Sequence, residues 1–227
     1  MPLQIPAHDL HRLLAETIPF SHPYDDLPSI NGVLLTFDGD NLLAVATDRF
    51  MLGISRYGLP EDERGKTPPF RIGIRLSDAQ NLLRHAKTVK ADRHARTVTI
   101  DVDEHGKVDI ADSSAPGLFS FDSPRGMDIV ARLDPTLFTF PNWEKLLHYS
   151  GERTPVSLVE FSADKLAAFL KVAGERPIQL MFRSAVSVVE ILIGREPDFV
   201  GLMMPRRPVD VMTLPDWIPA PPAEEKS

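Results

Sequence analysis

The chain has 227 residues, of which 43% are hydrophobic, and it carries a formal net charge of −7 with no cysteine. A chain of this length and composition builds one large or two small domains with a real core, which excludes a disordered or fibrous protein. The lack of cysteine excludes a disulfide framework, a thiolate metal site and a cysteine nucleophile. No apolar run approaches the roughly 20 residues that span a bilayer, and residues 1–12 lack the order of a signal peptide, so we expect a cytoplasmic protein without a membrane segment.

The first predicted unit is a helix followed by a β-hairpin. Leucines recur at helical spacing over residues 8–18, and Pro19 ends that helix. Residues 33–37 form a first strand, Asp38-Gly39-Asp40 is a turn that tolerates a positive φ, and the apolar residues 42–47 return as a second strand. A third strand ends near residue 56.

Two more units repeat this order in steps of about 60 residues. The second opens with a strand at residues 70–74 and continues with a helix over residues 78–93, for which Ser77 is the predicted N-cap and Gln80 completes a capping box. The third opens with a strand at residues 156–161 and a helix capped by Ser162, whose inward face carries Leu166, Phe169, Leu170 and Ala173. The strands after these two helices are predicted at residues 97–102, 107–111 and 118–121, and at residues 178–182, 187–193 and 199–203.

The units and their connections divide the chain into four parts. Residues 1–126 form a complete domain of two units, 127–155 a linker, 156–207 a half domain, and 208–227 a Pro-rich tail that is partly disordered. We expect Phe140 and Trp143 to pin the linker. The predicted fold class is α+β, with a helix laid on antiparallel strands three times, or about one and a half domains.

Residue patterns that support bond chemistry are missing from the sequence. The histidines form no cluster with carboxylates, no serine lies in a nucleophile elbow, and no Gly-rich phosphate loop occurs. Asp48 follows the second strand of the hairpin, and we expect it to close the strand end through local backbone hydrogen bonds rather than to act as a catalytic acid. The sequence therefore predicts no enzyme, no metal site and no cofactor.

The polar faces of the three helices carry basic residues in a chain that is acidic elsewhere. Solvated helix faces are one interpretation, because exposed Lys and Arg are common. The other is a surface that attracts the phosphate backbone of a nucleic acid without reading sequence. The residues expected to face such a backbone, which is DNA if the resemblance given below holds, are Arg12, Arg84, Lys87, Lys90, Arg93 and Lys171.

Three segments rich in Met, Leu and Pro have no obvious role in the core. They are residues 49–52, Pro141 with Leu146, and residues 202–205. Ordinary packing is one interpretation of these segments. A groove for a short apolar peptide is the other, since Met supplies an adaptable surface.

The chain resembles the bacterial DNA polymerase III β subunit family, the DNA sliding clamps. Asn31-Gly32-Val33-Leu34-Leu35 and Val45-Ala46-Thr47-Asp48 are similar to the hairpin of the family's middle domain, at the same spacing. Phe140-Pro141-Asn142-Trp143 is similar to its Phe-Pro-Asp-Tyr linker, and Met204-Pro205-Arg206-Arg207 to its C-terminal Met-Pro-Met-Arg. The resemblance covers about residues 5–207. It departs from the family at Arg49-Phe50-Met51, where the family has Gly-His-Arg.

The resemblance implies a DNA-clamp fold and a groove for partner peptides between the first and third units. The residues that it assigns to this groove are Ile30, Thr47, Arg49, Phe50, Met51, Leu52, Pro141, Lys145, Leu146, Ser162, Lys165, Ala185, Leu202, Met203, Met204, Pro205 and Arg206. Because Arg49-Phe50-Met51 departs from the family, we expect this groove to be more apolar and its peptide preference to differ.

The implied function is that of a processivity factor that tethers a DNA polymerase and other replication or repair proteins to DNA, with a clamp loader as a further partner. Family members close a ring of twelve units, whereas three are found here, so a closed ring would require four chains, and an open or monomeric clamp-like protein is the other option. Because the strands at the two ends of the chain would have free edges, we expect a homo-oligomer formed by strand pairing. The alternative is an adaptor or decoy that binds replication proteins without encircling DNA.

Overall fold

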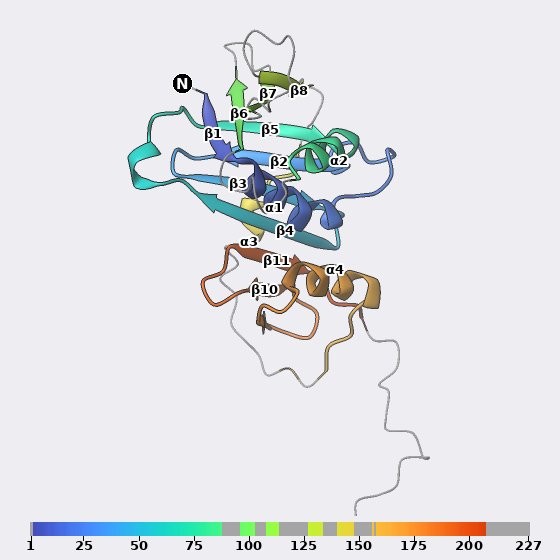
Figure 1. Cartoon of the computed structure of the whole chain (residues 1–227). Helices are drawn as coiled ribbons and strands as arrows, with labels where there is room; N and C mark the ends of the chain where they lie inside the picture. The colour runs from blue at the N-terminus through green and yellow to red at the C-terminus, as the bar shows by residue number, and fades with distance from the viewer. Residues whose placement is uncertain are drawn as a thin grey trace, which may run out of the picture.

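The computed structural model describes residues 2–87, 96–102, 108–113, 127–133, 140–147, 156 and 158–207. Helices lie against two antiparallel sheets in these parts of the chain (Figure 1). The four-stranded sheet has the order β1-β6-β7-β8 and the seven-stranded sheet the order β5-β2-β3-β4-β11-β10-β9. The predicted strand at residues 118–121 and the Pro-rich tail lie outside the described residues.

The first two units are each a strand, a helix and three further strands. The first contains β1 (Leu3–Pro6), α1 (Ala7–Thr17), the short helix η1 (Ile18–Phe20), β2 (Gly32–Phe37), β3 (Asn41–Thr47) and β4 (Met51–Gly58). After η2 (Glu61–Glu63), the second contains β5 (Phe70–Arg75), α2 (Leu76–His85), β6 (Thr97–Val102), β7 (Val108–Ser113) and β8 (Met127–Leu133). Gly39, with φ 110°, forms the expected turn between β2 and β3.

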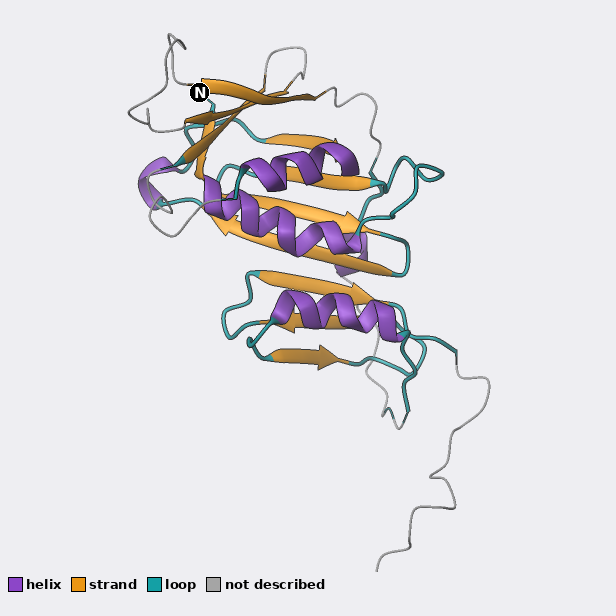
Figure 2. Cartoon of the chain, turned by 45° about the vertical axis from the view of Figure 1, so that its right-hand side comes forward, coloured by secondary structure: helices purple, strands orange, loops and turns teal. Residues whose placement is uncertain are grey.

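These two units exchange their opening strands. β1 opens the first unit but pairs with β6 of the second, and β5 opens the second but pairs with β2 of the first. Helices α1 and α2 pack against each other over the two sheets (Figure 2). The two units therefore form one domain in which neither sheet is complete without the other unit.

The third unit continues the seven-stranded sheet. It contains α4 (Ala163–Ala173), β9 (Ile178–Met181), β10 (Val189–Ile193) and β11 (Phe199–Met203), and it follows the short helix α3 (Glu144–Leu147). β11 pairs antiparallel with β4, with Gly201 opposite Gly53 and Met203 opposite Met51. We call this pairing the seam, because it joins segments far apart in sequence. The prediction of three helix-and-strand units is confirmed.

Four local predictions differ from the structure. In the predicted strand at residues 156–161, the described residues 156 and 158–161 form no strand, and Glu160 makes an isolated bridge to Arg206. Residues 127–133, predicted as linker, form β8. The second helix begins at Leu76, directly after β5, and has no side-chain cap, so Ser77 is not its N-cap; it ends at His85. Leu170, predicted to face inward, is 54% exposed.

These differences have physical causes. A strand forms where a neighbouring strand pairs with its backbone hydrogen-bonding groups. β8 has such a neighbour in β7. The opening segment of the third unit has no partner strand beside it among the described residues. The second helix starts early because Leu76 N, directly after β5, donates to Asn31 O at 3.2 Å, which fixes the chain at that point.

Side chains of the seven-stranded sheet alternate between two cores. One core lies under α1, α2 and α4 and includes Leu13, Leu82, Phe169, Met51 and Met203. The other lies on the opposite face and contains Leu34, Val45, Leu52, Ile54, Leu202 and Trp143. The three main helices thus share one face of the sheet, and the segment around Trp143 covers the other.

Two phenylalanine rings close the seam on the helix side. A Cβ atom built on Gly53 would lie 2.5 Å from the ring of Phe20, and one on Gly201 would lie 2.2 Å from the ring of Phe169. The two rings contact each other with centroids 4.7 Å apart, and both are fully buried. Because Gly53 and Gly201 lie opposite each other, the rings occupy the space that two side chains would otherwise fill.

Replacing either seam glycine is expected to destabilise the fold. Gly201→Ala forces its Cβ into the Phe169 ring, so the free energy of unfolding should fall by about 1–3 kcal/mol, as for overpacked cores. Urea unfolding of the full chain measures this. The matched control is Gly58→Ala at the end of β4, where the nearest atom to a new Cβ is Asn41 Oδ1 at 3.6 Å, an ordinary contact. Equal stability of both variants would contradict the close packing.

Candidate functional site

The turn after β3 is built by Thr47 and Asp48. Asp48 Oδ1 accepts hydrogen bonds from the backbone amides of Phe50 and Met51, both at 2.9 Å. Thr47 Oγ1 donates to Met51 O at 2.7 Å and accepts from Arg49 N at 3.2 Å. The prediction that Asp48 closes the strand end is confirmed. The same bonds hold Arg49 at φ 81°, in the left-handed region that favours glycine.

The turn also carries the contact between the first and third units. Lys165, near the start of α4, forms an ion pair with Asp48, whose side chain is 5% exposed. The Lys165 Nζ atom also lies 5.7 Å from the centroid of the Phe50 ring, within the range of a cation–π contact. Met204 N donates to Phe50 O at 2.8 Å. Phe50, Lys165 and Met204, predicted from widely separated segments, are therefore brought together.

On the opposite face, the linker segment packs over the seam. Trp143 is 6% exposed and shares a core with Leu52 of β4 and Leu202 of β11, and Phe140 packs against the same core. Phe140 and Trp143 therefore pack the described residues 140–147 of the predicted linker against the sheet. α3 then leaves Leu146 53% exposed, and Pro141 and Lys145 are exposed beside it in sequence.

The predicted groove residues divide by exposure. The exposed ones are Arg49, Phe50, Pro141, Lys145, Leu146, Ala185, Met204 and Arg206, and those of intermediate exposure are Ser162, Lys165 and Pro205. The buried ones are Ile30, Thr47, Met51, Leu52, Leu202 and Met203. Met51 and Met203 belong to the core under the helices, whereas Leu52 and Leu202 belong to the core under Trp143. Strand alternation thus sends neighbouring residues of the predicted groove to opposite faces.

Ser162 and Asp164 mark the start of α4 beside this turn. Ser162 is the N-cap residue, as predicted, although its side chain makes no capping bond. Instead, its hydrogen bond to the Asp164 carboxylate lowers the pKa of that fully exposed group.

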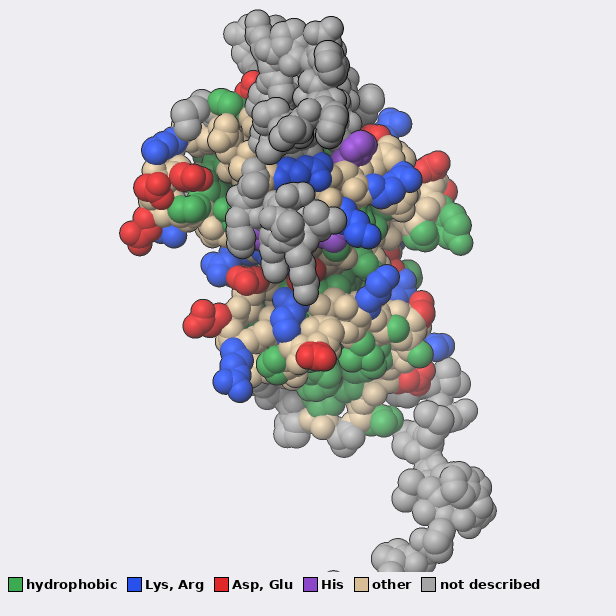
Figure 3. Space-filling model, viewed as in Figure 1, with side chains coloured by type: hydrophobic (Ala, Val, Ile, Leu, Met, Phe, Trp, Pro, Cys, Tyr) green, Lys and Arg blue, Asp and Glu red, His purple; other side chains and the backbone are tan. Residues whose placement is uncertain are grey.

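The residues expected to face DNA lie in different environments. Arg84, Lys87 and Lys171 are exposed, while Lys90 and Arg93 lie outside the described residues. Arg84 donates to Asn81 and Gln80 of its own helix. Lys and Arg side chains are spread over the middle of the face that carries the helices (Figure 3).

Arg12 differs from these exposed residues because its charge is paired. It lies 3.6 Å from Asp9 and 3.3 Å from Glu16, and it donates to Arg56 O at 2.9 Å. Burial lowers the pKa of neighbouring His11, and Lys87 lowers it further, so this histidine favours its neutral form. The helix face is therefore less positive around α1 than a count of basic residues suggests.

Glu16 forms a second link across the seam. Its carboxylate accepts hydrogen bonds from Ser55 Oγ of β4 at 2.5 Å and from Arg176 Nη2, after α4, at 2.7 Å. Its side chain is 10% exposed. The links therefore hold α4 at both ends: Lys165 to Asp48 near its start, and Arg176 to Glu16 after its last turn.

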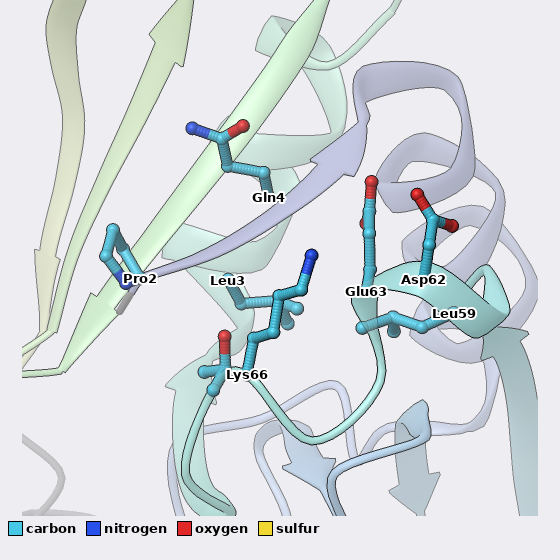
Figure 4. A pocket seen from close by; sticks show the side chains of 8 residues that line it. Pro2, Leu3, Gln4, Leu59, Asp62, Glu63 and Lys66 are labelled. Atoms are coloured by element: carbon cyan, nitrogen blue, oxygen red, sulfur yellow. The ribbon is translucent and has the colours of Figure 1, made fainter.

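Hollows among the described residues include the following two. One, of about 380 Å³, lies between η1, α2 and α4 and includes Asp48, Met51 and Lys165. The other, of about 250 Å³, lies between the start of β1 and the loop after β4 (Figure 4). Its lining includes Leu3, Leu59, Glu63 and Lys66, and no predicted site residue. Among the described residues there is no cluster of metal-binding side chains, and no helix is long and apolar enough to cross a membrane.

Comparison with solved structures identifies the fold. The chain aligns with a DNA polymerase sliding clamp from Pseudomonas aeruginosa, crystallised with a ligand, at a TM-score of 0.69 and 15% identity, covering 91% of this chain and 66% of that one. The chain has the sliding-clamp fold. The DNA polymerase III β subunit of Thermotoga maritima aligns at a TM-score of 0.67 and 13% identity, and a clamp from Bacillus subtilis at 0.61 and 15%. The DNA-clamp prediction is thus confirmed at the level of fold.

These comparisons also set the scale of the resemblance. The chain spans 64–66% of the length of these three clamps, which agrees with a shortened clamp-like chain. No family model matches the sequence, and no curated protein matches it. The fold is therefore retained at an identity too low to carry residue roles across.

Several residues that organise the site were not singled out by the sequence. The pairing of Gly53 with Gly201 could be predicted only if β4 and β11 were known to be neighbours. The role of Phe20, whose ring lies over Gly53, depends on the same knowledge. Glu16 was counted as neither a site residue nor a partner of Arg12, although its spacing of four residues from Arg12 on a helix was a usable signal.

Replacing Arg49 by glycine is expected to relieve backbone strain. An L-residue in the left-handed region costs about 1–2 kcal/mol, and glycine avoids that cost but adds freedom to the unfolded chain. Arg49→Gly should therefore raise the free energy of unfolding by up to about 1 kcal/mol. Arg49→Ala is the control, since it removes the same side chain and keeps the positive φ. Chemical denaturation measures the free energy of unfolding of each variant. An equal increase in both variants would show that the loss of the Arg49 side chain, and not the backbone conformation, is responsible.

Proposed function

We propose that this chain is a clamp-like processivity factor, which tethers a DNA polymerase and other replication proteins to double-stranded DNA and involves no bond chemistry. The observation that carries the proposal is the row of α1, α2 and α4 on one face of a continuous sheet with the sliding-clamp fold. Under this proposal the helix face lies toward DNA, and the seam region holds short peptide motifs of partner proteins.

The exposed apolar side chains near the seam support the peptide site. Phe50 is 59% exposed, Leu146 53% and Met204 44%. Large apolar side chains gain free energy when a partner covers them. Of the buried residues in the same segments, Met51 and Met203 pack in the core under the helices, and Leu52 and Leu202 pack in the core with Trp143.

An adaptor that binds replication proteins without encircling DNA is the second candidate. The pairing of Arg12 with Asp9 and Glu16 favours it, because that cation is not free to bind phosphate. The two candidates share the peptide site and differ at the helix face, so DNA binding separates them.

DNA binding is expected to depend on the exposed cations on α2, just after α2 and on α4. The triple variant Arg84→Ala, Lys87→Ala and Lys171→Ala should weaken binding to duplexes of any sequence to a similar extent. The slope of log K against log salt should become shallower by about 0.9 for each phosphate that the variant no longer neutralises. Fluorescence anisotropy with two duplexes of unrelated sequence, over a range of salt, measures both effects.

The matched control for DNA binding removes cations away from the helices. Lys66 and Arg195 are exposed in loops, and the double variant Lys66→Ala and Arg195→Ala should leave the slope close to that of the original chain. A wild-type chain that shows no salt-dependent binding would overturn the processivity factor and leave the adaptor.

Peptide binding is expected to depend on the exposed apolar residues at the seam. Leu146→Asp and Met204→Asp should each weaken binding of a peptide from the C-terminal tail of a bacterial replicative polymerase by about tenfold or more, because each places a charge where apolar contact is proposed. Isothermal titration calorimetry provides the affinity. Tyr24→Asp is the control, since Tyr24 is 70% exposed and lies in the loop before β2. Unchanged affinity in both seam variants would refute the peptide site.

A further inference from the structure

The third unit has the form of half a domain. In the complete domain each unit gives its opening strand to the other, as β1 pairs with β6 and β5 with β2. The third unit has neither side of this exchange among the described residues. Residues 158–161, where an opening strand belongs, form only the single bridge at Glu160, and β9 is the last strand of its sheet. An unpaired strand edge is a template for another strand.

Apolar residues of the third unit are exposed where their counterparts are buried. The repeated helix pattern aligns Leu170 of α4 with Leu14 of α1, a helix that packs on α2. Leu14 is fully buried, whereas Leu170 is 54% exposed. Leu180 of β9 aligns with Leu35 of β2, which is fully buried beside β5; Leu180 is 38% exposed. Hydrophobic side chains gather in the part of the molecule formed by the third unit (Figure 3).

The backbone of residues 158–161 is oriented for an added strand. Arg206 N donates to Glu160 O at 2.8 Å, so the polar groups of Glu160 point toward Arg206. In an extended chain the groups of Val159 and Phe161 then point to the opposite side. They have no backbone partner among the residues that the structure describes.

The open edge of β9 presents matching groups. Gly194 N donates to Pro177 O at 2.9 Å, and Gln179 lies opposite Leu192 in the same register. The backbone groups of residues 177, 179 and 181 therefore form the hydrogen bonds to β10. The backbone groups of Ile178 and Leu180, which alternate with them, face away from β10.

We propose that two copies of the chain complete this half domain reciprocally around a twofold axis. Each copy lays residues 158–161 antiparallel along β9 of the other, and the two α4 helices lie side by side, as α1 and α2 do. The contact is of the same kind on both copies, as a twofold axis requires. It follows from the fold alone and does not depend on DNA or peptide binding.

The complete domain sets the register of this contact. β1 and β6 place Leu3 opposite Ile100 and Ile5 opposite Val98. β5 and β2 use the equivalent pairs Ile72 with Leu35 and Ile74 with Val33. The same register places Val159 opposite Leu180, and Phe161 opposite Ile178, of the second copy. Glu160 and Gln179 of the two copies then face each other as a non-hydrogen-bonded pair.

The first test is the mass of the full chain in solution, measured by light scattering at micromolar concentration. The mass should be that of two chains or a multiple of two. Leu170→Asp should raise the dissociation constant of the dimer by about tenfold or more, because it buries a charge between two apolar helices. Leu146→Asp is the control: Leu146 is equally exposed but lies on α3, so this variant should keep the dimer. A monomer for the original chain would overturn the proposal.

A cysteine pair tests the register. A non-hydrogen-bonded antiparallel pair has Cα atoms about 4.5 Å apart, within the range of a disulfide, and the chain has no cysteine of its own. Glu160→Cys with Gln179→Cys should give a covalent dimer on a non-reducing gel after mild oxidation. Each single variant, and Glu160→Cys with Arg195→Cys, should not. An oligomer that tolerates Leu170→Asp and fails to cross-link would refute this contact and leave the DNA and peptide proposals standing.

Discussion

Helix α4 is fixed to the first unit at three points across the β4–β11 seam, and both candidate surfaces depend on that attachment. Lys165 pairs with Asp48 near the start of the helix, Phe169 packs on Phe20 at its middle, and Arg176 pairs with Glu16 after its end. The middle contact is possible only because Gly53 and Gly201 lie opposite each other and leave room for two rings. The hydrogen bonds between β4 and β11 set the register of the seam. The contacts of Lys165, Phe169 and Arg176 set the position of α4 relative to the first unit.

Asp48 connects local and long-range structure within this arrangement. One carboxylate oxygen accepts hydrogen bonds from two backbone amides of the turn, and the other forms the ion pair with Lys165 of α4. The turn that presents Phe50 is therefore held by the same side chain that holds the third unit. Removing a buried partner of an ion pair leaves the other charge uncompensated, so the shape of the turn and the placement of α4 are energetically coupled. The positive φ of Arg49 lies within this coupled turn.

The sequence predicted what periodicity and turn chemistry control. Leucine spacing located α1, the Asp38-Gly39-Asp40 turn located the β2–β3 hairpin, and Thr47-Asp48 closes β3 as expected. It failed where a partner distant in sequence decides the outcome. Residues 156–161 have strand-like composition, but those that the structure describes, 156 and 158–161, form no strand. Leu170 follows the helical pattern, but no second helix covers it among the described residues. The Met51-Leu52 and Leu202-Met203 pairs were predicted to line one groove, yet strand alternation sends each pair to two faces.

The basic residues of the helix face illustrate the same limit for electrostatics. A count along the sequence treats Arg12, Arg84, Lys87 and Lys171 alike, whereas the structure pairs Arg12 with two poorly exposed carboxylates. Among the described residues, the exposed cations of the predicted set are Arg84 on α2, Lys87 just after it and Lys171 on α4. Few unpaired cations give a weak, sequence-independent attraction to phosphate and a shallow salt dependence. Under the proposed function, such an attraction suits a chain that stays near DNA through its assembly and its tethered partners, because strong binding to phosphate would oppose movement along the duplex. The acidic net charge is compatible with that role, since only the face turned toward DNA has to avoid repelling it.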